Sequence, residues 1–347
     1  MSPKSNIQGI DLFCGAGGLT KGLQNAGIDI PCGVDIDAAC RYPYEYNCKA
    51  NFIESKVEKL EPKEIEGAFD GASFSLMAGC APCQPFSLYR QKANNRDSKW
   101  YLLQRFGQLV EQIEPDLVTM ENVPRISEQA VFHAFVKRLK RLRYHIHWSI
   151  VECVDYGIPQ TRKRLVLMGS KLGPVDFLSG RKTAPKTVRD AIGGLPSIQI
   201  GSAHPKDKLH VCSELSDINL KRIRASRPGG TWRDWGPDLV ADCHRKKTGK
   251  TYPSVYGRME WDEPAPTLTT QFYGFGNGRF GHPEQDRAIT LREGALLQTF
   301  PKSYRFTAPG KPIEFKKLGR LIGNAVPVKL GEVIGRSLVN HCENHTA

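Results

Sequence analysis

Apolar and polar positions in the first half of the chain alternate between two patterns. Short apolar runs with strand character are separated by stretches in which apolar positions recur at helical spacing. Strands are predicted at residues 8–13, 28–34, 74–78, 116–120, 144–152 and 164–168. Helices are predicted at residues 19–26, 38–50, 100–113 and 131–142. This alternation predicts an α/β fold with a doubly wound, mostly parallel sheet, which binds ligands beyond the carboxyl ends of its strands.

The pattern changes near Thr183. From there to about Asp286 the chain is rich in Gly, Pro, Arg, Lys and aromatic residues and has few periodic segments. We expect a smaller domain of irregular or β structure at residues 184–286. Helical periodicity returns at residues 291–297 and after Pro327, so residues 1–183 and 287–347 are predicted to form the larger domain.

Charge separates the same two regions. The formal net charge of the 347 residues is +13, and residues 181–260 carry 16 Lys and Arg against 8 Asp and Glu, a net +8. Such a cluster indicates either polyanion binding or a solvated basic surface. No apolar run approaches the ~20 residues that span a bilayer, and the N-terminus lacks the apolar core of a secretory signal. We therefore expect no membrane association and a cytoplasmic protein.

Ten cysteines are scattered through the chain, as expected of reduced thiols. Only Cys80 and Cys83 form a C-x-x-C pair, and no second pair offers the other ligands of a closed zinc site, so we expect no metal. Cys83 lies between two prolines that stiffen a turn at the predicted ligand-binding edge. It is a candidate nucleophile, whereas Cys80 sits nearer the strand and is expected to pack as a small hydrophobe.

Two further clusters follow later strands. Glu121 and Asn122 come at the end of the strand predicted at 116–120, while Gln160, Arg162 and Arg164 occupy alternate positions. Alternation on an extended segment directs these three side chains to one side. A thiol, a carboxylate and two guanidinium groups can therefore converge. The structural alternatives are a surface salt bridge for Glu121 and a solvated face for the arginines.

A glycine-rich turn follows the first predicted strand, in Asp11-Leu-Phe-Cys-Gly-Ala-Gly-Gly-Leu19. Gly15, Gly17 and Gly18 allow a tight turn and a close approach of the backbone to a ligand. Asp35 ends the next strand, where a carboxylate accepts hydrogen bonds from ribose hydroxyls. The alternative is a structural turn with a helix-capping Asp35.

In combination, these segments resemble the bacterial DNA (cytosine-5) methyltransferases over nearly the whole chain. The matching motifs occur in family order: D-L-F-C-G-A-G-G, P-C-Q-P-F-S, E-N-V, Q-T-R-K-R, R-A-I-T-L-R-E-G-A-L-L-Q-T-F-P and G-N-A-V-P. The resemblance implies a Rossmann-like methyltransferase fold that binds S-adenosyl-L-methionine and releases S-adenosyl-L-homocysteine. It also implies a target-recognition domain at residues 184–286.

The resemblance also implies roles for individual residues. Cys83 would add to C6 of a flipped cytosine, Glu121 would hydrogen-bond N3, and Arg162 and Arg164 would hold the base and the catalytic groups; Gln160 looks structural. The expected cofactor-binding residues are Phe13, Gly15, Gly17, Asp35, Ile36, Pro82, Asn324 and Val326. The family places an acid that reaches the adenine amino group after the third strand, where this chain has Lys56, so Glu58 or backbone groups would make that contact.

Double-stranded DNA is the implied partner of a monomeric, nucleoid-associated enzyme, and a cognate restriction endonuclease would act separately. Residues 88–99 are expected to form a polar loop that closes over the DNA. The expected DNA contacts are Gln84, Ser87, Arg90, Arg227, Trp232, Arg233 and Arg245.

Three other functions fit the sequence less well than DNA (cytosine-5) methylation. A tRNA cytosine-5 methyltransferase is disfavoured because its characteristic Cys-Phe-Thr tripeptide is absent from the sequence. A non-catalytic DNA-binding homologue is disfavoured by the intact Cys83, Glu121, Arg162 and Arg164. A NAD-dependent oxidoreductase is disfavoured by the incomplete G-x-G-x-x-G fingerprint. No residue of the sequence is identified as the base that removes the C5 proton, and ordered water is the expected candidate.

Overall fold

The computed structural model describes residues 6–82, 100–180, 184–253 and 255–346. By backbone contacts the chain forms two compact units, one comprising residues 1–156, 163–181 and 326–347 and the other residues 157–162 and 182–325. Residues 287–325 thus group with the second unit. The smaller domain expected at residues 184–286 stays a prediction.

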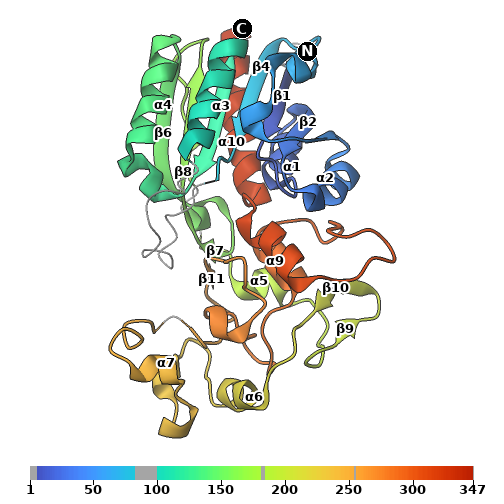
Figure 1. The fold of residues 1–347 in the computed structure, drawn as a ribbon, viewed down its shortest axis with the longest axis vertical. Coiled ribbons are helices and arrows are strands. Elements are labelled where there is room, and N and C mark those ends of the chain that lie inside the picture. Colours follow the sequence, from blue (N-terminus) through green and yellow to red (C-terminus); the bar gives the residue numbers. More distant parts are fainter. Residues whose placement is uncertain (1–5, 83–99, 181–183, 254, 347) are drawn as a thin grey trace. The chain divides into compact units, whose positions relative to one another are not determined.

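The first unit is built on a seven-stranded sheet in the order β3-β2-β1-β4-β5-β8-β6 (Figure 1). Its strands are β1 Ile7–Leu12, β2 Asp29–Asp35, β3 Asn51–Glu54, β4 Phe74–Gly79, β5 Leu117–Asn122, β6 His145–Glu152 and β8 Lys163–Ser170. Only β8 runs antiparallel to its neighbours, β5 and β6, within this sheet. The predicted doubly wound, mostly parallel sheet is confirmed.

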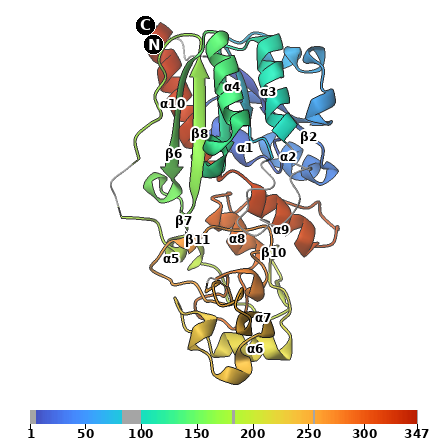
Figure 2. The same cartoon turned by 60° about the vertical axis from the view of Figure 1, so that its left-hand side comes forward.

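Helices cover both faces of this sheet. They are α1 Gly18–Asn25, α2 Arg41–Cys48, α3 Trp100–Ile113, α4 Ala130–Arg141 and α10 Val328–Thr346. Figures 1 and 2 show α3 and α4 on one face and α10, packed along α1, on the other. Glycines permit this close packing, since a Cβ on Gly22 would lie 2.3 Å from the carbonyl oxygen of Val328. α10 thereby holds α1, the helix that follows β1 in the chain, in place.

The second unit has little regular structure. Its elements are β7 Gln160–Thr161, α5 Val188–Ile192, β9 Ala203–His204, β10 Asp207–Val211, α6 Asp217–Arg224, α7 Asp242–Arg245, β11 Ala265–Pro266, α8 Leu291–Leu297 and α9 Phe315–Asn324. β7 pairs with β11, and β9 pairs with β10. The expectation of irregular structure is met, but short helices are more prominent than strands.

The predicted elements differ from the observed ones in several places, of which three concern the sheet edge and the longer helices. The helix predicted at residues 38–50 is divided into a 3-10 turn at Ala38–Cys40 and α2. β3 was not predicted from the pattern because its four residues carry only two apolar side chains. α9 was missed as well, although it buries one face.

Candidate active site

The turn after β1 is shaped by three left-handed backbone positions. Phe13 has φ 60°, Gly15 φ 54° and Gly17 φ 85°. Phe13 is strained there because it carries a side chain. A Cβ added to Gly15 would meet nothing within 4 Å, so open space lies beside the turn. The turn therefore presents its backbone at the carboxyl edge of the sheet.

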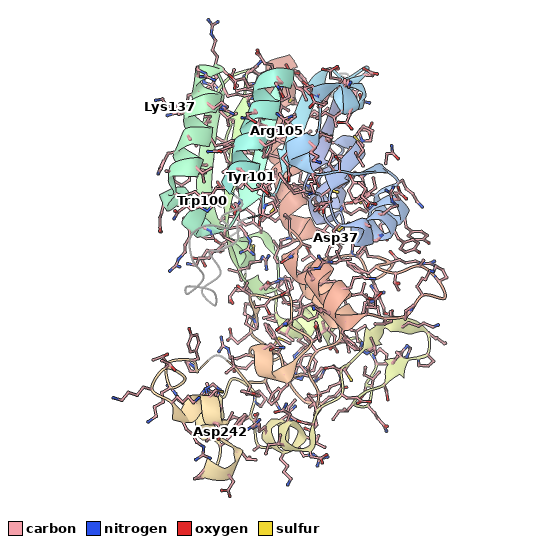
Figure 3. All side chains as sticks on the ribbon, in the orientation of Figure 1. Asp37, Trp100, Tyr101, Arg105, Lys137 and Asp242 are labelled. Carbon is pink, nitrogen blue, oxygen red and sulfur yellow. The ribbon has the colours of Figure 1, made fainter. Side chains whose placement is uncertain are left out.

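Asp35, at the end of β2, is tied to this turn. Its Oδ2 accepts a hydrogen bond from the Gly15 amide at 2.9 Å, and its Oδ1 accepts one from the Asp37 amide at 2.9 Å. Burial raises the pKa of Asp35, although these backbone donors act in the opposite direction. Asp37, which lies just beyond β2 (Figure 3), caps the following 3-10 turn by accepting from Ala39. Helix capping thus belongs to Asp37 and not to Asp35, whereas the hydrogen bonds that Asp35 accepts stabilise the turn.

Ile36 lies between these two acids and is 61% exposed. This exposed apolar side chain, directly after Asp35, offers a contact surface to an aromatic ring. Beyond β3, Lys56 and Glu58 are both exposed, and a contact of Glu58 or of backbone groups with the adenine amino group stays a prediction.

Asp11 is fully buried in β1 beneath the turn. Its Oδ2 accepts a hydrogen bond from the Thr20 hydroxyl at 2.7 Å. No partner for its Oδ1 is found among the described residues. Burial raises the pKa of Asp11 to about 7. This raised pKa could not be predicted from the sequence, because it depends on the elements that cover β1.

A buried carboxylate lies at the carboxyl end of β5. Glu121 is 3% exposed, and its Oε1 lies 2.9 Å from Nε of Arg164 on β8. Its Oε2 accepts a hydrogen bond from the Cys80 thiol at 3.0 Å. The structure thus brings Glu121 and Arg164 together, and the alternative of a surface salt bridge is wrong because both side chains are largely buried.

Cys80 differs from its expected role. It does not pack simply as a small hydrophobe, since its Sγ is hydrogen-bonded and the residue is partly exposed. Burial and the neighbouring Glu121 raise the pKa of its thiol well above the usual range. A thiol held in this form is a poor nucleophile.

Asn122, at the end of β5, makes a second link to the residues that follow β4. Its side-chain amide donates to the carbonyl oxygen of Ala81 at 3.0 Å, and its Oδ1 accepts from the Val123 amide. Pro82, the last described residue before the motif that contains Cys83, is exposed. The chain is therefore anchored directly before that motif.

Gln160 and Arg162 are buried inside the second unit. Gln160 contacts Gln298 at 3.0 Å and the Leu268 amide at 2.8 Å through its side chain. Arg162 donates to the carbonyl oxygens of Leu268 and Ala325. The intervening Thr161 and Lys163 are exposed, as the predicted alternation requires. A solvated face is thus excluded for Arg162, and Gln160 has the structural role expected of it.

Several predicted residues are not brought together by the structure. Asn324 ends α9 in the second unit, whereas Val326 belongs to the first unit. Their contribution to one cofactor pocket stays a prediction. The remaining predicted residues lie outside the described residues: Cys83, Gln84, Ser87, Arg90 and the loop at 88–99.

A basic and aromatic cavity of about 510 Å³ lies within the second unit. Its lining residues are Trp232, Arg233, Val240, His244, Arg245 and Lys250. Trp232 and His244 stack at 4.3 Å between ring centroids. His244 and Lys250 were missed from the sequence, although they flank the basic run that contains Arg245. Arg227 is exposed and lies 3.5 Å from Asp234.

Two properties of the described part of the chain bear on the chemistry available. None of its helices combines the length and the apolar character needed to cross a membrane. Its His, Cys, Asp and Glu side chains form no cluster of three or more that could hold a metal ion.

Comparison with known proteins places these features in a family. The family model for C-5 cytosine-specific DNA methylases matches residues 7–340. Type II methylase M.HgiDII of Herpetosiphon aurantiacus is 50% identical over 339 residues, covering 96% of this chain and 95% of that protein. Type II methyltransferase M1.BsuMI of Bacillus subtilis (strain 168) is 31% identical, covering 93% of this chain and 78% of that protein.

Solved structures give the same assignment for the fold. A prophage-encoded protein of E. coli, assigned as a DNA modification methyltransferase, has a TM-score of 0.74 and 25% identity, covering 98% of this chain and all of that one. The S. pombe Dnmt2 methyltransferase, at 18% identity and a TM-score of 0.64, shares the fold. The chain therefore belongs to the C-5 cytosine-specific DNA methylase family and is a DNA (cytosine-5) methyltransferase of the bacterial Type II kind.

Proposed function

We propose that this enzyme methylates C5 of a flipped cytosine within a specific duplex DNA sequence, through a covalent bond between Cys83 and C6. The observation that carries the proposal is the buried Glu121–Arg164 pair at the carboxyl edge of the sheet. This pair lies beside the strand end that leads into the Cys83 motif, since Asn122 holds Ala81.

The edge formed by β1 and β2 fits S-adenosyl-L-methionine. Open space beside Gly15, the oriented carboxylate of Asp35 and the exposed face of Ile36 suit the methionine end, the ribose and the adenine, respectively. Phe13, Gly17, Pro82, Asn324 and Val326 are proposed to complete the site. When bound, the cofactor supplies an electrophilic methyl group for C5 and is left as S-adenosyl-L-homocysteine.

The chain's own residues activate the cytosine. The Cys83 thiolate forms a bond to C6. The electron pair of the C5–C6 double bond is then shared by C5 and N3, which makes C5 nucleophilic. Glu121 makes a hydrogen bond at N3 and stabilises the charge that develops there. After methylation, loss of the C5 proton restores the double bond and breaks the bond between C6 and Cys83. Ordered water is our candidate for the base.

Arg164 orients Glu121, while Arg162 is proposed to act by fixing the backbone around Leu268 and Ala325. The cytosine must leave the duplex for this chemistry, which costs a few kcal/mol of unstacking and unpairing. The second unit is proposed to recognise the sequence, with Arg227, Trp232, Arg233 and Arg245 contacting DNA, together with Gln84, Ser87 and Arg90. A monomer that acts separately from any restriction endonuclease meets these requirements.

The test proceeds in two steps. The enzyme is first incubated with genomic DNA and S-adenosylmethionine, and bisulfite sequencing identifies the methylated cytosine. A duplex with 5-fluorocytosine at that position is then incubated with the enzyme, because fluorine at C5 blocks release of Cys83. We expect a covalent adduct with the wild type and none with Cys83→Ser.

Glu121→Gln should reduce the rate of adduct formation by about 100-fold or more. Methylation of tRNA but not of duplex DNA would overturn the DNA assignment. Methylation that persists in Cys83→Ser would overturn the covalent mechanism.

A further inference from the structure

We propose that Cys80 is a positioning residue for Glu121. The thiol of Cys80 holds the Glu121 carboxylate in the orientation that the cytosine ring requires. This inference rests on the proposed catalytic role of Glu121. It assigns the two cysteines of the C-x-x-C pair to different tasks, with Cys83 as the nucleophile and Cys80 as the support of its partner group.

The strand order creates the contact. β5 lies between β4 and β8, and Gly79 of β4 is paired in register with Met120 of β5. Cys80 and Glu121 are the next residues along these strands, and the Cys80 amide is fixed by the Leu12 carbonyl oxygen at 3.2 Å. The backbone of Cys80 is thus held by β1, so its side chain is a rigid support.

Glu121 is held from both neighbouring strands. Cys80, directly after β4, donates to Oε2 at 3.0 Å, and Arg164 of β8 lies 2.9 Å from Oε1. A guanidinium group tends to take both oxygens of a carboxylate, because two parallel hydrogen bonds are stronger than one. The Cys80 thiol occupies Oε2 and thereby restricts Arg164 to Oε1. At least one lone pair of each carboxylate oxygen stays available to a ligand.

The direction of the hydrogen bond follows from charge. A thiolate at this position would place a second negative charge 3.0 Å from Glu121, with Asp11 of β1 adding to the repulsion and Arg164 opposing it. Burial and Glu121 raise the pKa of Cys80, so the group remains a thiol at neutral pH. It therefore donates its proton to the carboxylate, which fixes the orientation of the Glu121 side chain.

Three substitutions at Cys80 separate positioning from packing. Cys80→Ala removes the donor, Cys80→Val keeps apolar bulk without a donor, and Cys80→Ser restores one. Cys32→Ala is the matched control, because it removes the same thiol from β2 of the same sheet. Each full-length variant is measured for thermal stability, cofactor affinity, and the rate of methylation and of adduct formation.

We expect Cys80→Ala and Cys80→Val to slow both reactions about 10-fold at saturating substrates, while cofactor affinity stays unchanged. Cys80→Ser should return the rate to near wild type, because the serine hydroxyl restores a donor to Oε2 of Glu121. Cys32→Ala should alter neither reaction.

Two results would overturn the inference. One is a Cys80→Ser enzyme as slow as Cys80→Val, which would show that sulfur contributes packing alone. The other is a wild-type rate of methylation and of adduct formation in Cys80→Val. If Cys80→Ala does not fold, the Ser and Val pair decides the question. A wild-type enzyme that forms no adduct would instead contradict the proposed function, so the two failures are distinguishable.

Discussion

The two units of this protein are stabilised by different kinds of contact. In the first, a continuous apolar core joins the sheet to its helices and includes Leu12, Val34, Met77, Phe106 and Val118. In the second, one apolar cluster surrounds Ile223, Trp232 and Phe275, other apolar side chains are buried along α8 and α9, and several charged side chains are buried as well. Regular periodicity is sufficient to build the first kind of core, whereas the second also contains individual buried polar pairs.

The central pair of the second unit is Arg287 and Glu293. Both side chains are 1% exposed and form two hydrogen bonds, of 2.8 and 2.7 Å. Glu293 also closes the capping box of α8 with Thr290. Burial opposes ionisation of Glu293, but Arg287 outweighs it and leaves the pKa of Glu293 below its usual value. Neighbouring His282 is kept neutral, because burial lowers its pKa to about 4.

The stability of the second unit is therefore expected to be more sensitive than that of the first to the loss of one charge. A buried ion pair broken on one side leaves an uncompensated charge, which costs more than most losses of apolar contact. The proposed functions follow the same division, with catalysis at the sheet edge of the first unit and DNA recognition by the second unit.

The largest effect is expected from Glu293→Gln. Because Arg287 would stay buried without a counter-charge, the free energy of unfolding should fall by about 3–5 kcal/mol. Urea unfolding measures this loss. Glu314→Gln, which breaks an exposed pair with Lys317, is the control and should change little. Unfolding of both variants at the same urea concentration would contradict the importance of this buried pair. So would a variant with Met at both 287 and 293 that is no more stable than Glu293→Gln.

Asp11→Asn tests the buried polar group of the first unit. Between about pH 4 and 7 the folded protein keeps the Asp11 proton while the unfolded chain has lost it, so wild-type stability should fall as pH rises and level off above about 7. At pH 8 the variant should be more stable than the wild type by about 2–4 kcal/mol. Thermal unfolding across pH measures this difference. Asp29→Asn, an exposed position on β2, should retain the wild-type slope; an unchanged slope in Asp11→Asn would contradict the assignment.

Ile36→Ala tests the cofactor edge without affecting the core. Loss of an exposed apolar surface should weaken binding of S-adenosylmethionine about 5-fold, with no change in thermal stability. Isothermal titration calorimetry measures this affinity. Ile150→Ala removes a similarly exposed side chain from edge strand β6 and should bind the cofactor normally. Equal affinities in the two variants would place the adenine elsewhere.

The smallest effect is expected from Lys250→Ala in the basic cavity of the second unit. DNA affinity should fall about 3-fold, and the slope of affinity against salt concentration should decrease by about 1 if one phosphate contact is lost. Fluorescence anisotropy at several salt concentrations measures both quantities. Lys208→Ala removes the same charge from β10, and an identical loss there would indicate a nonspecific effect of net charge.

Much of the first unit was determined by the sequence. Strand and helix periods depend on residues close together in the chain, so the order of β1, α1 and β2 and the glycine turn were predictable. Alternation likewise predicted that Gln160 and Arg162 lie on one side of an extended segment, but not that this side is buried. The family motifs then identified the reaction class, which the comparisons confirmed.

Only the tertiary structure decided how these parts act on one another. Cys80 and Glu121 lie 41 residues apart, and no local pattern signals that their side chains meet. The raised pKa of Asp11 depends on the elements that cover it, and the buried pairs of the second unit interrupt any apolar period. Local order is encoded by neighbours in the chain, whereas burial and electrostatic coupling arise only when distant segments exclude water together.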